Sequence, residues 1–406
     1  MAEEKLVPKL RFNGFNENWN EDKFENIFDI KNGLNKGKDY FGKGIQILNY
    51  MDVNNYELNT ENTIKGLVEL NDEEIKRYSV KPNDLFFTRT SETSEEIGLT
   101  SAYVGKEIKC VFSGFLLRAR PKMDVNSLFF AYYFRSPKQR NNIIKFSSIT
   151  TRALISGGNL SKMKIKFPNI GEQNKITKLF LILNKKIELL EKKYQYYQDF
   201  KKYLMQQIFT QKLRFAKFDY EWLEYHLKDT GKIITGTTPS TKNKDNFSDN
   251  GYLWVTPGDI SNKRIVTSTE RNLSKEGLNN GRELPPNSIL VTCIGATIGK
   301  ICMIKEVGSC NQQLNAIIPN EQFDPDFIYY TIQYNAERLK LIAGNTATPI
   351  LNKKSFGNIK FEFPNLKEQQ RISGLLTSMD DAIDNIESGI NNMQYFKKGL
   401  LQQMFI

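Results

Sequence analysis

The segment Gly295–Lys300 (Gly-Ala-Thr-Ile-Gly-Lys) is the stretch of this chain most similar to a phosphate-binding loop. In that loop four residues separate the two glycines, and a Ser or Thr after the lysine holds magnesium. Here three residues separate the glycines, and Ile301 follows the lysine. The spacing therefore predicts a turn inside a sheet and argues against a nucleotide site.

The spacing of the cysteines and of the single histidine also gives no sign of a reactive site. The four cysteines have no Cys-x-x-Cys spacing and share a single histidine; they are Cys110, Cys293, Cys302 and Cys310. This pattern fits neither a disulfide framework nor a zinc site, so we expect buried or semi-buried thiols. His226 follows Trp222-Leu-Glu-Tyr without an obvious acid or nucleophile partner, which favours a surface or packing role. Motifs for a dinucleotide, a metalloprotease, a serine hydrolase or an amino-methyltransferase are missing, so the sequence indicates a binding protein.

Charge and composition narrow the kind of partner. The chain has 406 residues, 57 Lys+Arg against 46 Asp+Glu, and 39% hydrophobic residues, enough to bury several cores. Residues 101–170 alone hold 13 basic and 2 acidic side chains. Such a block indicates a polyanionic partner, with a solubilising face as the alternative. No apolar run approaches the length of a membrane span, and the acidic N-terminus lacks signal-peptide character, so we expect a cytoplasmic protein with no membrane partner.

The chain contains an internal repeat. Three segments recur with the patterns Lys-Leu-Arg-Phe, Phe-Pro-Asn-x-x-Glu-Gln and Phe-Lys-Lys; the pairs are 9–12 with 212–215, 167–173 with 363–369, and 200–202 with 396–398. The first pair is offset by 203 residues and the other two by 196, while the middles of the copies differ. Similar ends predict the same structural contacts made twice, and dissimilar middles predict two versions of one task.

The end of each copy predicts a long helix. Ten positions from Ile176 to Ile208, and ten more from Ile372 to Met404, alternate in steps of four and three, and nine of ten are apolar in each. This is a heptad pattern, and it predicts two coiled-coil helices about 57 Å long. We expect an antiparallel pair, because the second globule returns the chain; the alternative is pairing with another molecule. The shared break, Lys201 and Lys397, marks a register, an opening toward another subunit, or a snorkelling lysine.

The middles contain short runs rich in β-branched and aromatic residues, which predict strands at 44–48, 84–88, 252–256 and 288–292. Residues 127–134 and 326–335 predict short helices. Each middle is therefore expected to be an α+β globule. The predicted division is 1–168 for the first globular domain, 169–210 for the first helical arm, 211–364 for the second globular domain and 365–406 for the second arm.

Two divergent globules, each followed by Phe-Pro-Asn-x-x-Glu-Gln and a long helix, resemble the specificity (S) subunit of Type I restriction-modification enzymes, HsdS. The early Lys9-Leu-Arg-Phe with Trp19, and Gly236-Thr-Thr-Pro-Ser240, are also similar to that family. The resemblance implies two target-recognition domains joined by antiparallel coiled-coil helices with pseudo-two-fold symmetry, reading the halves of a bipartite double-stranded DNA site. It implies two modification (methyltransferase) subunits along the arms, with restriction subunits added through the complex. S-adenosylmethionine, ATP and Mg would then bind partner subunits and not this chain.

Candidate DNA-reading residues follow from the need for Arg, Lys, Asn, Ser or Thr on loops that enter a groove. In the first globule they are Arg89, Thr90, Arg118, Arg120, Ser148, Thr151 and Arg152. In the second they are Thr237, Thr238, Ser240, Lys242, Thr292, Lys300, Asn345, Thr346, Thr348, Lys353 and Lys354. Candidate partner-binding residues on the arms, which could equally form the helix core, are Phe200, Leu204, Phe209, Phe396, Leu400 and Phe405.

Two other functions compete with this interpretation. One is a coiled-coil scaffold whose two heads bind proteins and have no DNA role. The other is a nuclease or methyltransferase acting alone, which the missing cofactor motifs disfavour. A duplex preference that appears only with the methyltransferase partner and weakens with salt separates the specificity subunit from the scaffold.

Overall fold

The computed structural model describes residues 6–149, 152–344 and 349–406, and the chain divides into two compact units. The first unit comprises Met1–Leu189 with Ile390–Ile406, and the second comprises Leu190–Gly389. Each unit therefore contains one globule, the beginning of one long helix and the end of the other. Among the described residues, no helix combines the length and the apolar character that crossing a membrane requires.

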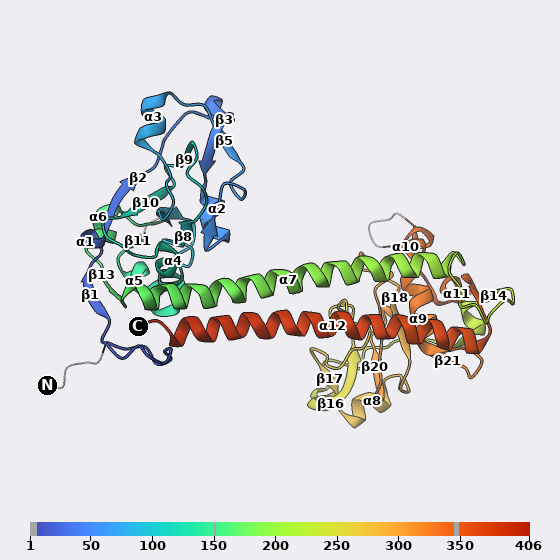
Figure 1. Cartoon of the computed structure of the whole chain (residues 1–406). Coiled ribbons are helices and arrows are strands. Elements are labelled where there is room, and N and C mark those ends of the chain that lie inside the picture. Colours follow the sequence, from blue (N-terminus) through green and yellow to red (C-terminus); the bar gives the residue numbers. More distant parts are fainter. Residues whose placement is uncertain (1–5, 150–151, 345–348) are drawn as a thin grey trace. The chain divides into compact units, whose positions relative to one another are not determined.

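The two long helices expected from the heptad pattern are α7 (Ile170–Phe209) and α12 (Leu366–Gln403). In the first unit the end of the chain lies beside the start of α7 (Figure 1). There the ring centroids of Phe405 and Phe180 are 5.8 Å apart. In the second unit Met205 and Ile208, near the end of α7, share a core with Ile372 at the start of α12. Both units therefore place one helix end against the other helix start, which confirms the antiparallel pair.

The repeated Phe-Pro-Asn-x-x-Glu-Gln segment explains where each long helix begins. The side-chain oxygen of Asn169 accepts a hydrogen bond of 3.0 Å from the backbone N–H of Glu172, and Asn365 caps Glu368 at the same distance. An Asn in this position satisfies one of the N–H groups that a helix start leaves open. The glutamine of the segment reaches back, because Gln173 Nε2 donates to the carbonyl of Pro168 at 2.8 Å. Its equivalent in the second copy donates to the preceding Pro364 carbonyl at 2.8 Å.

The same segment also anchors each globule. Glu172 is fully buried and accepts two hydrogen bonds from Arg11, of 2.8 and 2.7 Å. Glu368 is equally buried and accepts bonds of 3.0 and 2.9 Å from Arg214. Gln173 accepts from the backbone N–H that precedes α4 (Ser127–Arg135), as Gln369 does before α9 (Pro325–Tyr334). The expectation that the similar ends make the same contacts twice is thus confirmed.

In its described residues, the first globule contains four small sheets and short helices. Their strands are, sheet by sheet, β1 (Asn20–Lys23) and β13 (Lys164–Phe167); β2 (Phe28–Asn32), β10 (Leu116–Pro121), β6 (Leu85–Thr88), β8 (Thr100–Tyr103) and β4 (Leu58–Asn59); β5 (Gly66–Val68), β3 (Phe41–Leu48) and β9 (Cys110–Phe112); β11 (Ser148–Ile149), β12 (Ala153–Leu154) and β7 (Thr90–Ser91). The short helices besides α4 are α1 (Phe24–Ile27), α2 (Tyr50–Asn55), α3 (Asp72–Arg77), α5 (Pro137–Lys145) and α6 (Gly157–Ser161).

The described part of the second globule repeats this plan with fewer strands. Its sheets are β14 (Leu223–His226) with β22 (Lys360–Phe363); β15 (Gly231–Thr235), β21 (Leu314–Pro319), β18 (Ile289–Thr292) and β19 (Ile301–Met303); β17 (Asn272–Leu273), β16 (Phe247–Val255) and β20 (Gly308–Cys310). The short helices besides α9 are α8 (Lys275–Asn280), α10 (Ala336–Ala343) and α11 (Lys353–Gly357). The predicted strands correspond to β3, β6, β16 and β18, and the two predicted short helices to α4 and α9, so the α+β expectation is confirmed.

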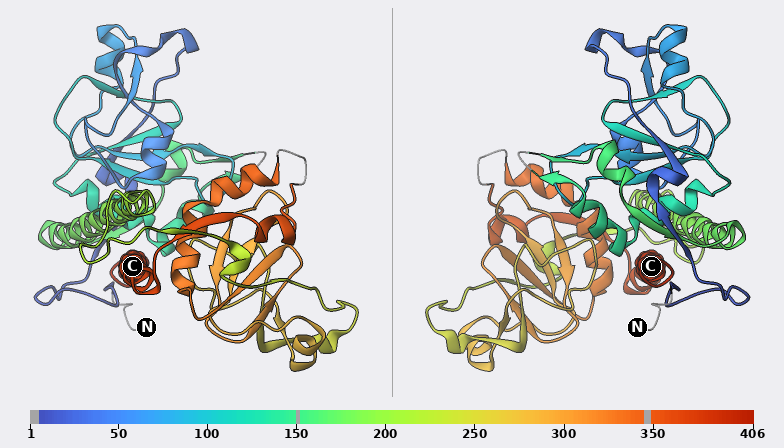
Figure 2. Two further views of the ribbon diagram at one scale, coloured as in Figure 1. Left: turned by 90° about the vertical axis from the view of Figure 1, so that its right-hand side faces the viewer. Right: turned by 90° about the vertical axis from the view of Figure 1, so that its left-hand side faces the viewer.

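Within each unit the two faces of the globule differ. Helices α4 and α9 lie next to the long helices, where Phe129 of α4 packs on Phe405 with ring centroids 5.4 Å apart. The three-stranded sheets that contain β3 and β16 lie on the side of each globule farther from the long helices (Figures 1 and 2). The sequence-divergent sheets are thus presented away from the shared framework.

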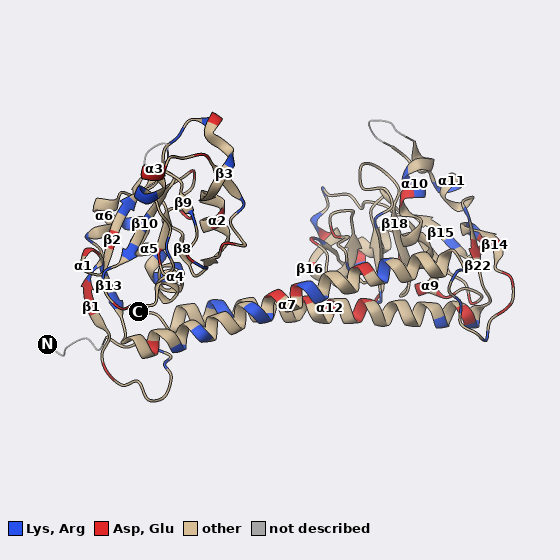
Figure 3. Ribbon diagram, turned by 45° about the horizontal axis from the view of Figure 1, so that its top comes forward, with Lys and Arg blue, Asp and Glu red and all other residues tan. Residues whose placement is uncertain are grey.

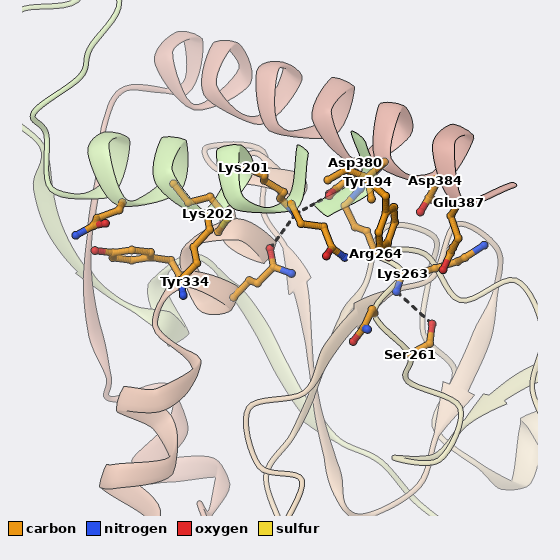
Figure 4. A pocket seen from close by; sticks show the side chains of 16 residues that line it. Tyr194, Lys201, Lys202, Ser261, Lys263, Arg264, Tyr334, Asp380, Asp384 and Glu387 are labelled. Carbon is orange, nitrogen blue, oxygen red and sulfur yellow. Dashed lines mark hydrogen bonds and ion pairs between the residues drawn. The ribbon is translucent and has the colours of Figure 1, made fainter. Parts of the chain in front are cut away.

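The lysine that interrupts each heptad pattern forms an ion pair. Lys201 Nζ lies 2.5 Å from Asp380 Oδ1 of α12 (Figure 4). The Tyr330 hydroxyl donates to the other carboxylate oxygen at 2.6 Å. Lys397 Nζ instead lies 2.5 Å from Glu57 Oε1, which belongs to the first globule. Both heptad patterns therefore have a lysine at the same position. Its carboxylate partner belongs to a long helix in one unit and to the globule in the other.

Two glycines at equivalent positions, Gly33 and Gly236, mark a close approach of backbones. A Cβ on Gly33 would lie 2.0 Å from the carbonyl oxygen of Ser113, and one on Gly236 would lie 2.0 Å from that of Asn311. Backbone atoms cannot yield by such a distance without a shift of the chain. Any other residue at either position must displace the backbone segment that faces it.

We therefore expect Gly33→Ala and Gly236→Ala each to destabilise the protein by about 2–3 kcal/mol. For units of this size this corresponds to a fall in Tm of roughly 5–10 °C in a thermal unfolding scan. Gly374→Ala is the matched control, because this exposed glycine of α12 has open space around it. It should gain about 0.5–1 kcal/mol from the helix propensity of alanine. An unchanged Tm for both sheet variants would contradict the close approach.

The ion pair of Glu57 with Lys397 predicts a dependence on pH. Burial alone would raise the pKa of the Glu57 carboxyl, but the charges of Lys397 and Arg135 outweigh burial and hold this pKa below its ordinary value. A depressed pKa contributes stability that is present above the unfolded-state pKa and is lost as the pH falls through the lower folded-state value.

Glu57→Gln should accordingly cost about 1–2 kcal/mol at pH 7, and the difference from the unsubstituted chain should shrink as the pH falls below about 4. The measurement is urea unfolding of both proteins at pH 7 and pH 3. Lys398→Gln, which removes the exposed neighbouring charge, should show no such pH-dependent difference. An equal difference between Glu57→Gln and the unsubstituted chain at both pH values would refute the ion-pair contribution.

Candidate nucleic-acid interface

Two loops of the first globule meet edge to edge. In β7 and β12, Thr90 lies opposite Leu154, and in β11 and β12 Ser148 lies opposite the same Leu154. This pairing brings the predicted Arg89 and Thr90 near the predicted Ser148 and Arg152. Thr151, which was also predicted, lies outside the described residues.

A hollow of about 520 Å³ opens beside these loops, and Thr90 and Arg152 contribute to its lining. The Tyr50 hydroxyl lies 3.3 Å from Glu96 Oε2 at its wall, and partial burial together with the Glu96 carboxylate raises the pKa of Tyr50. The Phe115 side chain is 59% exposed at the same opening. Hydroxyl, carboxylate, guanidinium and aromatic groups thus converge on one opening, and these are groups that can contact base edges.

Sequence reasoning missed Tyr50 and Phe115. A signal for Phe115 existed, because it directly follows Ser113-Gly114 between two strand-like runs. A turn between strands leaves its side chain facing water, so an aromatic residue there indicates a binding role. For Tyr50 the sequence offers no comparable signal, since its approach to Glu96 depends on the tertiary fold.

In the second globule the phosphate-loop-like segment forms a turn inside a sheet, as expected. Strands β18 and β19 run antiparallel, with Val291 opposite Ile301, and the turn between them contains Gly295–Lys300. Thr292 is fully buried in β18, so its side chain faces the core. Lys300 is exposed and donates from Nζ to the carbonyl of Ile260 at 3.3 Å.

A second loop packs against this turn. The backbone N–H of Gly295 donates to the carbonyl of Pro349 at 2.9 Å, and that of Leu351 donates to Cys293 at 2.8 Å. The predicted Asn345, Thr346 and Thr348 lie outside the described residues. Lys353 and Lys354 are exposed on α11. The same two loops therefore meet in both globules, although they differ in length and composition.

The Gly236-Thr-Thr-Pro-Ser240 segment forms the next edge of the second globule. Trp254 Nε1 donates to the carbonyl of Thr237 at 3.1 Å, and Asn246 Nδ2 donates to that of Ser240 at 3.0 Å. The Thr238 hydroxyl donates to the Gln312 side chain. These bonds hold the backbone, and the side chains of Thr238, Ser240 and Lys242 remain exposed.

The basic block at 101–170 is used largely inside the first globule. Arg118 is only 4% exposed and donates to the Ser79 carbonyl at 3.1 Å, and Arg120 forms two bonds of 2.7 Å with the buried Asp84. Arg135 donates to the carbonyl oxygens of four residues: Val53, Asn54, Tyr56 and Thr100. Burial lowers the pKa of Arg140 to about 10. The polyanion interpretation of this block therefore loses its main support, and Arg118 and Arg120 act within the globule.

The six predicted partner-binding residues divide into two groups. Leu204, Leu400 and Phe405 are less than a tenth exposed, and Phe209 stacks on Tyr334 with ring centroids 5.0 Å apart. These four form the packing between the helix ends and the globules. Phe200 and Phe396, at equivalent positions, are 39% and 55% exposed.

A hollow of about 730 Å³ lies between the long helices and the second globule (Figure 4). Side chains of both signs line it, including Lys202, Lys263, Asp384 and Glu387. Opposite charges around one opening do not favour an anion or a cation. The charge of this hollow therefore does not indicate which kind of ligand it would bind.

The four cysteines are buried free thiols, as expected. Burial raises the pKa of Cys110, Cys293 and Cys310 to about 12, so these thiols are protonated and unreactive. Across residues 6–149, 152–344 and 349–406 no three His, Cys, Asp or Glu side chains are grouped so that they could hold a metal ion.

A family model for the Type I restriction modification DNA specificity domain matches residues 16–196 and 220–393, which include both globules and most of both long helices. The chain belongs to this family. The two matched segments correspond to the two copies of the repeat, so family membership and internal duplication rest on the same residues.

Named specificity subunits are similar to parts of the chain. The EcoR124I/EcoR124II subunit of Escherichia coli is 30% identical over 226 residues, which are 53% of this chain and 52% of that protein. The MjaIX subunit of Methanocaldococcus jannaschii is 29% identical over 197 residues, or 47% of this chain and 45% of that protein. The chain thus spans about half the length of these relatives. The putative MjaX subunit of the same archaeon is 25% identical over 91% of this chain and 88% of its own length.

Solved structures share the fold. The S subunit of the Type I restriction-modification system of M. genitalium superposes with a TM-score of 0.61 over 98% of this chain and 99% of that chain, at 15% identity. A chain from a study of complex assembly and conformational transition of the type I system gives 0.55 over 94% and 96%, at 13% identity. At such identities the likeness shows the architecture: two globules and two long antiparallel helices.

The internal role of the basic block can be tested by stability. We expect Arg120→Gln to lower the stability of the protein by about 2 kcal/mol or more, because it leaves the buried Asp84 carboxylate without its partner. Arg118→Gln should lower it by about 1 kcal/mol, because it removes one of the two arginine donors to the Ser79 carbonyl. Lys242→Gln, which removes an exposed charge, should leave Tm unchanged. Thermal unfolding of the three variants measures the difference. Unchanged Tm values for both arginine variants would show that these side chains are available for DNA.

Proposed function

We propose that this chain is the DNA sequence-specificity subunit of a Type I restriction-modification complex. The observation that carries the proposal is the match of the specificity-domain family to both copies of the repeat. In the proposed role each globule recognises one half of a bipartite double-stranded DNA site. The chain itself is non-catalytic, and it acts in the cytoplasm, where the DNA is.

The loops described above support a reading role. In each globule two loops pair side by side, and exposed polar side chains lie on them or beside them. In the first globule these include Ser148 and Arg152, and in the second they include Thr238 and Lys242 on the neighbouring edge. Hydroxyl and cationic groups on paired loops can contact base edges and phosphates together. The loops differ between the copies, so the two half-sites should differ in sequence.

The long helices support the docking of two modification subunits. Phe200 and Phe396 stand at equivalent positions of α7 and α12 and remain exposed. Exposed aromatic residues on otherwise polar helices favour protein partners. Because the repeat supplies each position twice, two copies of one partner can bind by pseudo-two-fold symmetry. S-adenosylmethionine, ATP and Mg would bind the modification and restriction subunits.

The proposal is tested by sequencing the methylome of cells that contain the partner subunits, with and without this chain. We expect one bipartite methylated motif to depend on the chain. Ser148→Ala with Arg152→Ala should relax or change only one half of that motif, and Thr238→Ala with Lys242→Ala only the other half.

All variants should keep the Tm of the unsubstituted chain, since the substituted side chains are exposed. A methylome that does not change when the chain is removed would favour the protein-binding scaffold instead. If the variants change neither half of the motif, the residues that read DNA lie outside these loops.

A further inference from the structure

A hollow of about 690 Å³ in the second globule is lined by four lysines and by no acidic residue. Lys228 and Lys232 come from the segment that leads into and forms β15, and Lys353 and Lys354 begin α11. Blue segments mark β15 and α11 in Figure 3. Four like charges around one opening create a positive potential that favours an anion.

The first globule has a hollow at the equivalent place with the opposite character. About 540 Å³ in volume, it lies between β2 and α6 and is lined by Glu25, Asp29, Gly157 and Gly158, together with Arg89 and Lys122. The two acids precede Lys228 and Lys232 by 203 residues, and the two glycines precede Lys353 and Lys354 by 196. These are the two offsets of the repeat. Each lysine of the second hollow therefore replaces an acid or a glycine of the first.

Strand pairing and capping confirm that the two places are equivalent. Strand β2 pairs antiparallel with β10 as β15 pairs with β21. Helix α6 is capped by Ser156, which accepts from Asn159 N, and α11 is capped by Asn352, which accepts from Ser355 N. The two hollows are thus one architectural feature that carries a different set of charges in each copy.

The charges of the first hollow are balanced within the globule. Arg118 lies 3.7 Å from Asp29, and Lys122 Nζ donates to the backbone carbonyl of Glu25 at 2.7 Å. In the second hollow, by contrast, Lys228 donates to the neutral Asn358 side chain at 3.0 Å. Over the described part of the chain, none of the four lysines has a carboxylate within ion-pair distance. The second hollow lacks an internal counter-ion and the first does not.

We propose that the four-lysine hollow binds the phosphate backbone of the DNA duplex next to the half-site read by the second globule. The inference rests on the proposed function. The hollow adjoins the reading loops, because Lys353 follows Leu351, whose N–H bonds to Cys293 at the β18–β19 turn. Phosphate contacts position a protein around its base contacts, and lysine suits a phosphate as a compact point charge.

This site accounts for the distribution of charge along the chain. Residues 211–406 hold 23 basic and 21 acidic side chains, so the second copy has little net charge to attract DNA. Concentrating four uncompensated lysines in one hollow supplies a local anion site without a large net charge. In the first globule many of the cations are bonded internally, so its larger net charge is not matched by a similar hollow.

The experiment uses the full chain assembled with its modification subunits and a duplex carrying the methylated motif found in cells. Lys232→Gln, Lys353→Gln and Lys354→Gln are combined in one variant. Lys217→Gln, Lys244→Gln and Lys275→Gln, three exposed lysines of the same unit, form the control with the same change in charge. Binding is measured between 0.05 and 0.5 M salt, a range chosen because each phosphate contact contributes about 0.9 to the slope of log K against log salt.

We expect the hollow variant to reduce that slope by about 2–3 and the affinity by about 100-fold near 0.15 M salt, with the methylated motif unchanged. The control variant should change both the salt slope and the affinity by much less. Equal slopes for the two variants would overturn the inference while leaving the proposed function intact. No duplex preference in the unsubstituted complex would instead refute the proposed function.

One further outcome concerns the partner. An acidic surface of the modification subunit is another anion that could occupy the hollow. If the hollow variant assembles with fewer modification subunits in native mass spectrometry, the lysines bind protein and not DNA, and the inference is wrong. Full assembly together with a reduced salt slope supports it.

Discussion

The two buried carboxylates at the starts of the long helices are the constraint on which the rest of the structure depends. Glu172 and Glu368 are completely buried, and a buried charge without a partner is very unfavourable. Each is paired with an arginine from the beginning of its own copy, Arg11 or Arg214. The pairing ties the first residues of a copy to the start of its arm, which closes the globule between them.

The residues around these carboxylates extend the constraint to the whole unit. The neighbouring Gln173 and Gln369 bond to the backbone before α4 and α9, so the helix that faces the arm is fixed in place. The end of the other long helix then packs into the same core. In the first unit, for example, Phe405, which follows α12, packs on Phe180 of α7. Each compact unit consequently needs both copies of the repeat, although each globule comes from one.

Outside these contacts, the middles of the two copies differ in charge more than in architecture. The hollow beside β2 carries two acids and two cations, whereas the hollow beside β15 carries four lysines and no acid. Likewise the lysine that interrupts the heptads pairs with Glu57 of a globule in one unit and with Asp380 of a helix in the other. A fixed framework with variable charges suits the proposed recognition of a different half-site by each globule.

The sequence by itself determined the duplication, the long helices and the family, because repeated motifs and heptad spacing are visible in a single chain. The antiparallel pairing was expected from the sequence, but pairing with another molecule was excluded only by the contacts in each unit. The repeated Arg, Asn, Glu and Gln could be identified as structural, since both copies retain them. What only the tertiary structure decided is which polar side chains remain available. Arg118 is enclosed by its own globule, whereas Lys232, unremarkable in the sequence, meets Lys353 across a hollow. Burial and charge balance depend on neighbours far apart in the chain, and the fold alone brings those neighbours together.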